Sequence, residues 1–116
     1  MAIIRRELEP ILANVVETGS FVFTAGCIGE DTELDVEGQT RMALGDVDKY
    51  LALCGSDKLH ILWALIWVAD IRLRDAMNKV WLEWVDPKNL PARACVEAKM
   101  ADPRCLVEIQ VVAVKK

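Results

Sequence analysis

The sequence predicts a small α+β fold, in which two helices cover one face of a mixed β-sheet. Apolar side chains alternate or run continuously over five short segments, as in strands, and recur at helical spacing over two others. The order is strand, strand, helix, strand, helix, strand, strand, which favours crossover connections within one sheet. A chain of 116 residues suits one domain that spans residues 1–116.

The first two strands are predicted to form a hairpin. Residues 14–18 and 21–25 flank Gly19-Ser20, and a two-residue separation that contains glycine is typical of a tight turn. The acidic, glycine-containing segment 27–37 is predicted to be a loop. Residues 39–54 then form a helix that Gly55 ends, with apolar positions at Ala43, Val47, Tyr50, Leu51 and Cys54.

The remaining elements alternate strand and helix before the two final strands. Residues 61–69 are predicted to be a strand, and residues 92–100 and 106–114 are the last two strands. Between them, residues 72–85 form a second helix that Asp86-Pro87 closes, with an apolar side made of Leu73, Met77, Val80, Trp81 and Trp84.

The strand 61–69 is apolar on both sides, which bears on self-association. One side carries Ile61, Trp63, Leu65 and Trp67, and the other carries Leu62, Ala64, Ile66 and Val68. Two helices can cover only one face of the sheet. Because an exposed apolar face favours aggregation, we expect another copy of the chain to cover the second face.

Two charged residues stand out in the final strands. Alternation sends Arg93, Cys95 and Glu97 to one face of their strand, and Glu108 and Gln110 to one face of theirs. If these strands pair, a cation and a carboxylate share a site. A guanidinium suits a substrate carboxylate, and a carboxylate can accept a proton from water, so the pattern indicates hydrolysis.

Composition narrows the classes of partner. The formal net charge is -4 and there is no basic stripe, so nucleic acid is a weak candidate. The longest apolar run, 61–69, is too short for a membrane helix, and no apolar segment of signal-peptide length follows the N-terminus. The four cysteines show no CxxC pairing and accompany a single histidine, which indicates reduced thiols in a cytoplasmic protein without a zinc site.

The chain resembles the Rid (YjgF/UK114) family of enamine and imine deaminases. The most specific part is the segment 91–98, with Arg93, followed by the glutamate strand at 106–109. Phe21-Val22-Phe23-Thr24-Ala25-Gly26, Gly38-Gln39-Thr40-Arg41, 61–70, Met77-Asn78 and 111–114 fall in the family's order. The resemblance implies a chorismate-mutase-like (ferredoxin-like) fold and a homotrimer with ligand sites in the clefts between subunits.

The resemblance also implies roles for individual residues. Arg93 is expected to clamp the carboxylate of a 2-imino acid, and Glu108 to position the attacking water. Cys95 presents backbone groups, Asn78 matches a recurring asparagine near the start of the second helix, and Gly26 lies near the ligand cleft. The implied reaction is hydrolysis of 2-aminoacrylate or 2-iminopropanoate to a 2-keto acid and ammonia, with no metal or organic cofactor.

Other interpretations stay open at this point. Arg93 is also explained by a structural ion pair with Glu97 or Glu108, and Glu108 by a paired residue at a subunit interface. The chain departs from the family at Leu12, where many active members have tyrosine, and at Ala25-Gly26-Cys27, where Ser-Gly-Gln is frequent. A sensor that binds small carboxylates without turnover and a chaperone-like protein are the competing functions.

Overall fold

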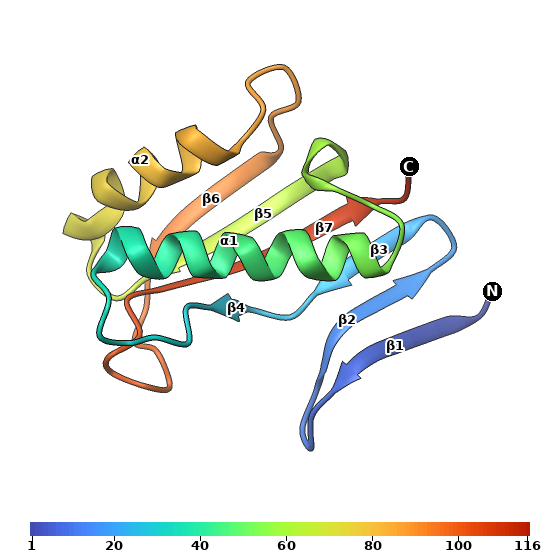
Figure 1. Cartoon of the computed structure of the whole chain (residues 1–116), viewed down its shortest axis with the longest axis horizontal. Coiled ribbons are helices and arrows are strands. Elements are labelled where there is room, and N and C mark those ends of the chain that lie inside the picture. The colour runs from blue at the N-terminus through green and yellow to red at the C-terminus, as the bar shows by residue number, and fades with distance from the viewer.

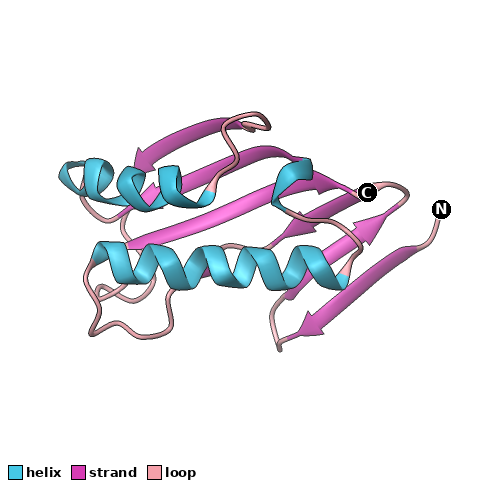
Figure 2. Ribbon diagram, turned by 45° about the horizontal axis from the view of Figure 1, so that its top comes forward, coloured by secondary structure: helices cyan, strands magenta, loops and turns pink.

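The computed structural model describes the whole chain, residues 1–116, and confirms the predicted α+β fold (Figure 1). The elements are β1 (Ile3–Leu8), β2 (Ala13–Thr18), β3 (Phe21–Thr24), β4 (Cys27–Ile28), α1 (Val36–Leu53), β5 (Ile61–Val68), α2 (Arg74–Trp84), β6 (Ala92–Glu97) and β7 (Val107–Val114). Both α-helices lie on the same face of the sheet, as Figure 2 shows. None of the helices combines the length and apolarity needed to cross a bilayer.

The order of strands in the sheet is β1-β2-β3-β7-β5-β6, and the short β4 pairs with β7. β5 and β6 are parallel and joined by α2, whereas the other paired strands are antiparallel. The last strand of the chain, β7, therefore lies in the middle of the sheet (Figure 1). The pairing of the arginine and glutamate strands that the sequence suggested does not form, because β5 lies between them.

The prediction of a loop at residues 27–37 is wrong at both ends of the segment. Its first two residues form β4, which pairs with β7 through Cys27 and Ile28. Its last two residues already belong to α1, which begins at Val36 rather than at residue 39. Asp35 caps the helix, since its Oδ1 accepts the Gly38 N–H at 2.9 Å.

One strand, β1, is absent from the predicted elements. It pairs with β2 in antiparallel register, with Arg6 opposite Val15. All six of its residues are exposed, and the Ile3-Ile4-Arg5-Arg6 pattern does not alternate. A strand at the edge that buries neither face carries no period-two signal, so its residues alone do not reveal it.

A bulge changes which side chains of β5 share a face. Ile61 pairs with Ala113 and Trp63 with Val112, so Leu62 is an extra residue between adjacent partners. Ile61 therefore lies on the helix side with Ala64, whereas the sequence placed it with Trp63. Past the bulge the predicted alternation holds, with Ile66 and Val68 buried toward the helices.

The face of the sheet away from the helices is apolar and uncovered in one chain. The register puts Phe23, Val112 and Trp63 side by side across three strands, and Phe21 lies beside Phe23 with 6.4 Å between ring centroids. All three aromatic side chains are among the exposed large apolar residues. The opposite face contributes to a core of 21 buried residues shared with α1 and α2. The uncovered face is the surface for which the sequence predicted a second copy.

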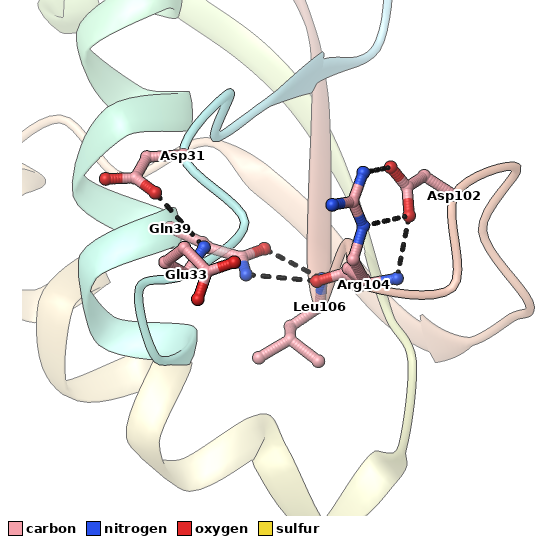
Figure 3. Close-up of polar contacts among 6 residues, drawn as sticks. All are labelled: Asp31, Glu33, Gln39, Asp102, Arg104 and Leu106. Carbon is pink, nitrogen blue, oxygen red and sulfur yellow. Dashed lines mark hydrogen bonds and ion pairs between the residues drawn. The ribbon is translucent and has the colours of Figure 1, made fainter.

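Gln39 connects the start of α1 to the segment that leads into β7 (Figure 3). Its fully buried amide donates to the carbonyls of Leu34 and Arg104 at 3.1 and 3.2 Å and accepts the Leu106 N–H at 2.8 Å. Because β7 begins one residue after Leu106, these bonds help to fix the start of the strand that carries Glu108.

A buried carboxylate joins the two ends of the chain. Glu17 on β2 accepts from Arg6 Nε at 3.1 Å and from Lys115 Nζ at 2.7 Å. Hydrogen bonds from the Cys54 thiol, Lys115 and Arg6 lower the pKa of Glu17 to about 2. The first strand, the end of α1 and the C-terminus thus meet at one charged group.

Candidate functional site

Arg93 lies under α2, on the helix side of the edge strand β6. It pairs with Ala64, whose side chain is buried beneath the helices, so the two residues face the same way. Its guanidinium donates from Nη1 to Asn78 Oδ1 at 2.7 Å and stacks over the Trp81 ring at 5.2 Å. The sequence predicted both Arg93 and Asn78 as site residues, and the fold brings them into contact.

No carboxylate lies within ion-pair distance of Arg93. The ion pairs of the chain all involve other residues, and Glu97 instead accepts the Ile71 N–H at 2.9 Å. Burial lowers the pKa of this half-buried guanidinium, and the nearby Arg74 lowers it further. A structural ion pair with Glu97 or Glu108 is therefore not formed within one chain, and most of the five N–H donors of Arg93 are free for an anion.

A cavity of about 270 Å³ opens beside Arg93. It lies between the second half of α2 and the start of β6, and its lining residues are Asn78, Trp81, Leu82, Val85, Leu90 and Arg93. Four of these six residues are apolar. The cavity therefore offers one cation and one amide at the edge of an apolar wall.

Cys95 lies next to this cavity in sequence but points into the core. It pairs with Ile66, which is fully buried on the helix side, and it packs against the core cluster. Burial raises the pKa of its thiol, so the thiolate is disfavoured at neutral pH. The backbone of Cys95 lies on the edge strand β6, and its role in presenting backbone groups to a ligand stays a prediction.

Glu108 occupies the other face of the sheet. It pairs with Trp67 in β5, whereas its neighbours Val107 and Ile109 are buried toward the helices. Burial raises the pKa of its carboxyl, and no cation lies within ion-pair distance. An unpaired carboxyl with a raised pKa is suited to accept and return a proton.

Gly26 determines where the Glu108 side chain lies. A Cβ at position 26 would lie 2.6 Å from Glu108 Cδ and closer still to Oε2. The carboxyl thus rests directly on the glycine backbone, and any side chain at position 26 would displace it. This contact gives the predicted site residue Gly26 a physical role.

Glu108 borders a cleft of about 370 Å³ where β3 ends and β4 begins. The lining residues are Glu9, Leu12, Asn14, Gly26, Cys27, Ile28, Glu30, Asp46, Tyr50 and Glu108. Burial raises the pKa of Asp46, and Glu30 raises it further. The resemblance had placed Leu12 and Gly26-Cys27 near the ligand cleft, and these residues line it. Glu9 of the β1–β2 turn, and Asp46 and Tyr50 of α1, were not predicted here, because their place in the cleft depends on tertiary contacts that no local pattern reports.

The two halves of the predicted site are therefore separate within one chain. Arg93, Asn78 and the apolar cavity lie on the helix side of β6, and Glu108 and Gly26 lie at a different cleft beyond β5. Arg93 and Glu108 thus line different cavities of one chain.

This fold and these two half-sites define a small α+β protein with a free guanidinium at one cavity and an unpaired carboxyl at another. The chain belongs to the endoribonuclease L-PSP family, whose model matches residues 8–115, and thus to the group known as RutC, YjgF or Rid proteins. This membership confirms the resemblance found in the sequence.

Individual relatives cover almost the whole chain. A RutC family protein of Haemophilus ducreyi is 36% identical over 96% of this chain and 95% of its own length. The RutC family protein YoaB of Escherichia coli is 35% identical over 97% of this chain and 98% of its own length. The crystal structure of NMB1025, a YjgF family member from Neisseria meningitidis, is 40% identical with a TM-score of 0.96 and covers 100% of this chain and 97% of that one.

Proposed function

We propose that this protein hydrolyses reactive 2-imino acids, such as 2-iminopropanoate formed from 2-aminoacrylate, to 2-keto acids and ammonia. The observation that carries the proposal is the half-buried Arg93 guanidinium without a carboxylate partner. Because a buried charge is costly when unpaired, such a group favours an anionic ligand. The carboxylate of a 2-imino acid is such an anion, and a guanidinium binds a carboxylate through two parallel hydrogen bonds.

In the proposed reaction, water attacks the imine carbon and gives a proton to Glu108. The substrate is the protonated imine, so the C=N electron pair moves to a nitrogen that already carries its extra proton, and a neutral carbinolamine results. Glu108 gives its proton to the amine nitrogen, and the C–N bond breaks with its electron pair going to nitrogen as the C=O bond forms. The regenerated Glu108 carboxylate takes the hydroxyl proton and passes it to the departing ammonia, so that one water and one iminium ion give one keto acid and one ammonium ion.

The negative charge of the Glu108 cleft favours a protonated imine over a polyanion as its ligand. Glu9, Glu30 and Asp46 line the same cleft as Glu108, and a protonated imine is a cation that such a cleft stabilises. The same carboxylates repel the phosphates of RNA, and the net charge of the chain is -4. We therefore assign the cleft to a small imine. We further propose that the protein acts in the cytoplasm, on imines that pyridoxal-phosphate enzymes release.

The proposal requires assembly, and we infer a homotrimer with its sites between subunits. The uncovered apolar face with Phe21, Phe23 and Trp63 supports self-association. The separation of Arg93 from Glu108 supports sites to which one subunit gives the guanidinium and its neighbour the carboxyl.

The test is ammonia and keto-acid release from an imine pool that an amino-acid oxidase generates in place, with semicarbazide trapping the remainder. We expect the parent to accelerate imine decay and Arg93→Ala to lose the effect while the assembly is retained. Arg72→Ala, which removes an exposed arginine paired with Asp70 at 2.6 Å, is the matched control. Equal rates for the parent and Arg93→Ala would refute the role of Arg93. Stabilisation by keto acids without ammonia release would indicate a carboxylate sensor instead.

A further inference from the structure

Two of the most exposed large apolar side chains of the protein flank the Arg93 cavity. Leu82 on α2 is 73% exposed, and Leu90 in the loop before β6 is 64% exposed. They approach from different segments and meet at the same opening, where Trp81 and Val85 form the deeper wall. Apolar surface gathered around one cation differs from scattered exposed leucines, because both features face one ligand-sized space.

A single small molecule satisfies both features when it carries a carboxylate and an apolar group on neighbouring atoms. In a 2-imino acid, the carboxylate and the side chain are bonded to the same carbon. When Arg93 holds the carboxylate, the side chain starts one carbon away from it, in the same cavity that Leu82 and Leu90 line. A cavity of about 270 Å³ is small, but it is more than a methyl group requires.

We propose that this cavity receives the side chain of the substrate, and that the protein prefers 2-imino acids with branched aliphatic side chains, of the type derived from leucine, over those derived from alanine or serine. The inference rests on the proposed function and names the substrate class within it. Each additional buried carbon strengthens binding, so the leucine-type substrate gains over the alanine-type substrate in proportion to the apolar area covered. We expect a preference of at least about tenfold in kcat/KM.

The lining also predicts what the cavity rejects. Four of the six lining residues are apolar, and the polar groups are the Arg93 guanidinium, already assigned to the carboxylate, and the Asn78 amide, whose oxygen accepts from Arg93. A second carboxylate on the side chain would find no further cation in the lining. Imines derived from aspartate or glutamate are thus expected to be poor substrates.

The experiment compares two imines and their two stable keto-acid products on the assembled protein. Turnover is measured with imines generated from leucine and from alanine, and binding is measured by calorimetry with 4-methyl-2-oxopentanoate and pyruvate. Leu82→Ser and Leu90→Ser are compared with Leu53→Ser, which changes an equally apolar, exposed leucine at the end of α1. Light scattering reports the mass of each assembly.

We expect tighter binding and faster turnover of the leucine-derived ligands by the parent, and a selective loss of that preference in Leu82→Ser and Leu90→Ser. Turnover of both imines without preference, or equal losses of activity on both in the variants, would overturn the assignment of the cavity to the substrate side chain. The proposed deaminase function would still stand. A changed assembly mass in either variant would assign the leucines to subunit contacts and also overturn it. If the parent protein showed no turnover and no binding of any of these ligands, the proposed function itself would be refuted.

Discussion

Arg93 and Glu108 point to opposite faces of the same sheet, with strand β5 between them. Arg93 aligns with Ala64 on the helix side, and Glu108 aligns with Trp67 on the uncovered side. Neither has an ion-pair partner in its own chain. Two unpaired, opposite charges directed away from each other are consistent with a site completed by a neighbouring copy.

The first prediction concerns complementation between subunits. Arg93→Ala and Glu108→Gln should each be inactive alone, whereas co-expression of the two in equal amounts should restore about one quarter of parent activity if trimers assemble at random. The restored sites take Arg93 from one subunit and Glu108 from the next. Co-expression of Arg93→Ala with the double variant is the control, and recovery there would contradict the arrangement.

The second prediction concerns the glycine beneath Glu108. Gly26→Ala should abolish imine hydrolysis, because the new methyl group occupies the place of the Glu108 carboxyl. Gly45→Ala is a matched control within α1, where an added Cβ meets nothing within 4 Å. It should raise the free energy of unfolding by about 1 kcal/mol and leave activity unchanged. Full activity of Gly26→Ala would show that the position of Glu108 is unimportant.

The third prediction concerns the cost of keeping Glu108 unpaired. Since burial raises its pKa, the ionised carboxylate destabilises the folded state at neutral pH. Glu108→Gln should therefore raise the melting temperature at pH 7, and the difference should shrink as the pH falls below the ordinary carboxyl range. Thermal unfolding of the parent and the variant, measured at pH 7 and again below the ordinary carboxyl range, checks this. A lower melting temperature for the variant at pH 7 would indicate that a cation in the assembly pairs with Glu108.

The fourth prediction concerns acid stability. The pKa of Glu17 is lowered from 4.5 to about 2, so its contribution to stability is complete above pH 4.5 and is lost as the pH falls toward 2. Glu17→Gln should lower stability at pH 7 and flatten the acid limb of the stability curve. Glu83→Gln removes a carboxylate from the exposed surface of α2 and controls for the change in net charge. Parallel acid limbs for the parent and Glu17→Gln would contradict the assignment.

The fifth prediction concerns Gln39. Gln39→Leu leaves the Leu106 N–H and the Leu34 and Arg104 carbonyls without their partner, which should cost about 2 to 4 kcal/mol of unfolding free energy. Chemical denaturation measures the change. Arg104→Ala removes only an exposed pair with Asp102 and should cost less than about 1 kcal/mol. Similar losses in both variants would show that the buried amide has no special role.

The helices and β7 could be predicted because their burial is one-sided and periodic, and β5 because its apolar run is continuous. Val47 and Leu51 on α1, and Met77 and Val80 on α2, are buried at helical spacing, as expected. β1 could not be predicted, since it is exposed on both sides. The bulge at Leu62 could not be predicted either, because a register shift is a property of the paired strands and leaves no mark in one of them.

Some residues of the candidate site were predicted individually, but their arrangement was not. Arg93 and Asn78 were each expected, and their contact at 2.7 Å follows from α2 crossing over β6. The separation of Arg93 from Glu108 depends on β5 inserting between two strands that are consecutive in sequence. Tyr50 and Asp46 reach the Glu108 cleft only through the packing of α1 on the sheet.

The position of β7 also constrains how the sheet closes during folding. β7 joins β3 to β5, and without it the β1–β3 ribbon has no strand pairing to the β5–β6 pair. Because β7 is far from β3 in sequence, this pairing is a long-range contact and forms slowly. Until it forms, Phe21 and Phe23 on one part and Trp63 on the other belong to separate pieces of sheet, whose open edges can pair with those of another folding chain.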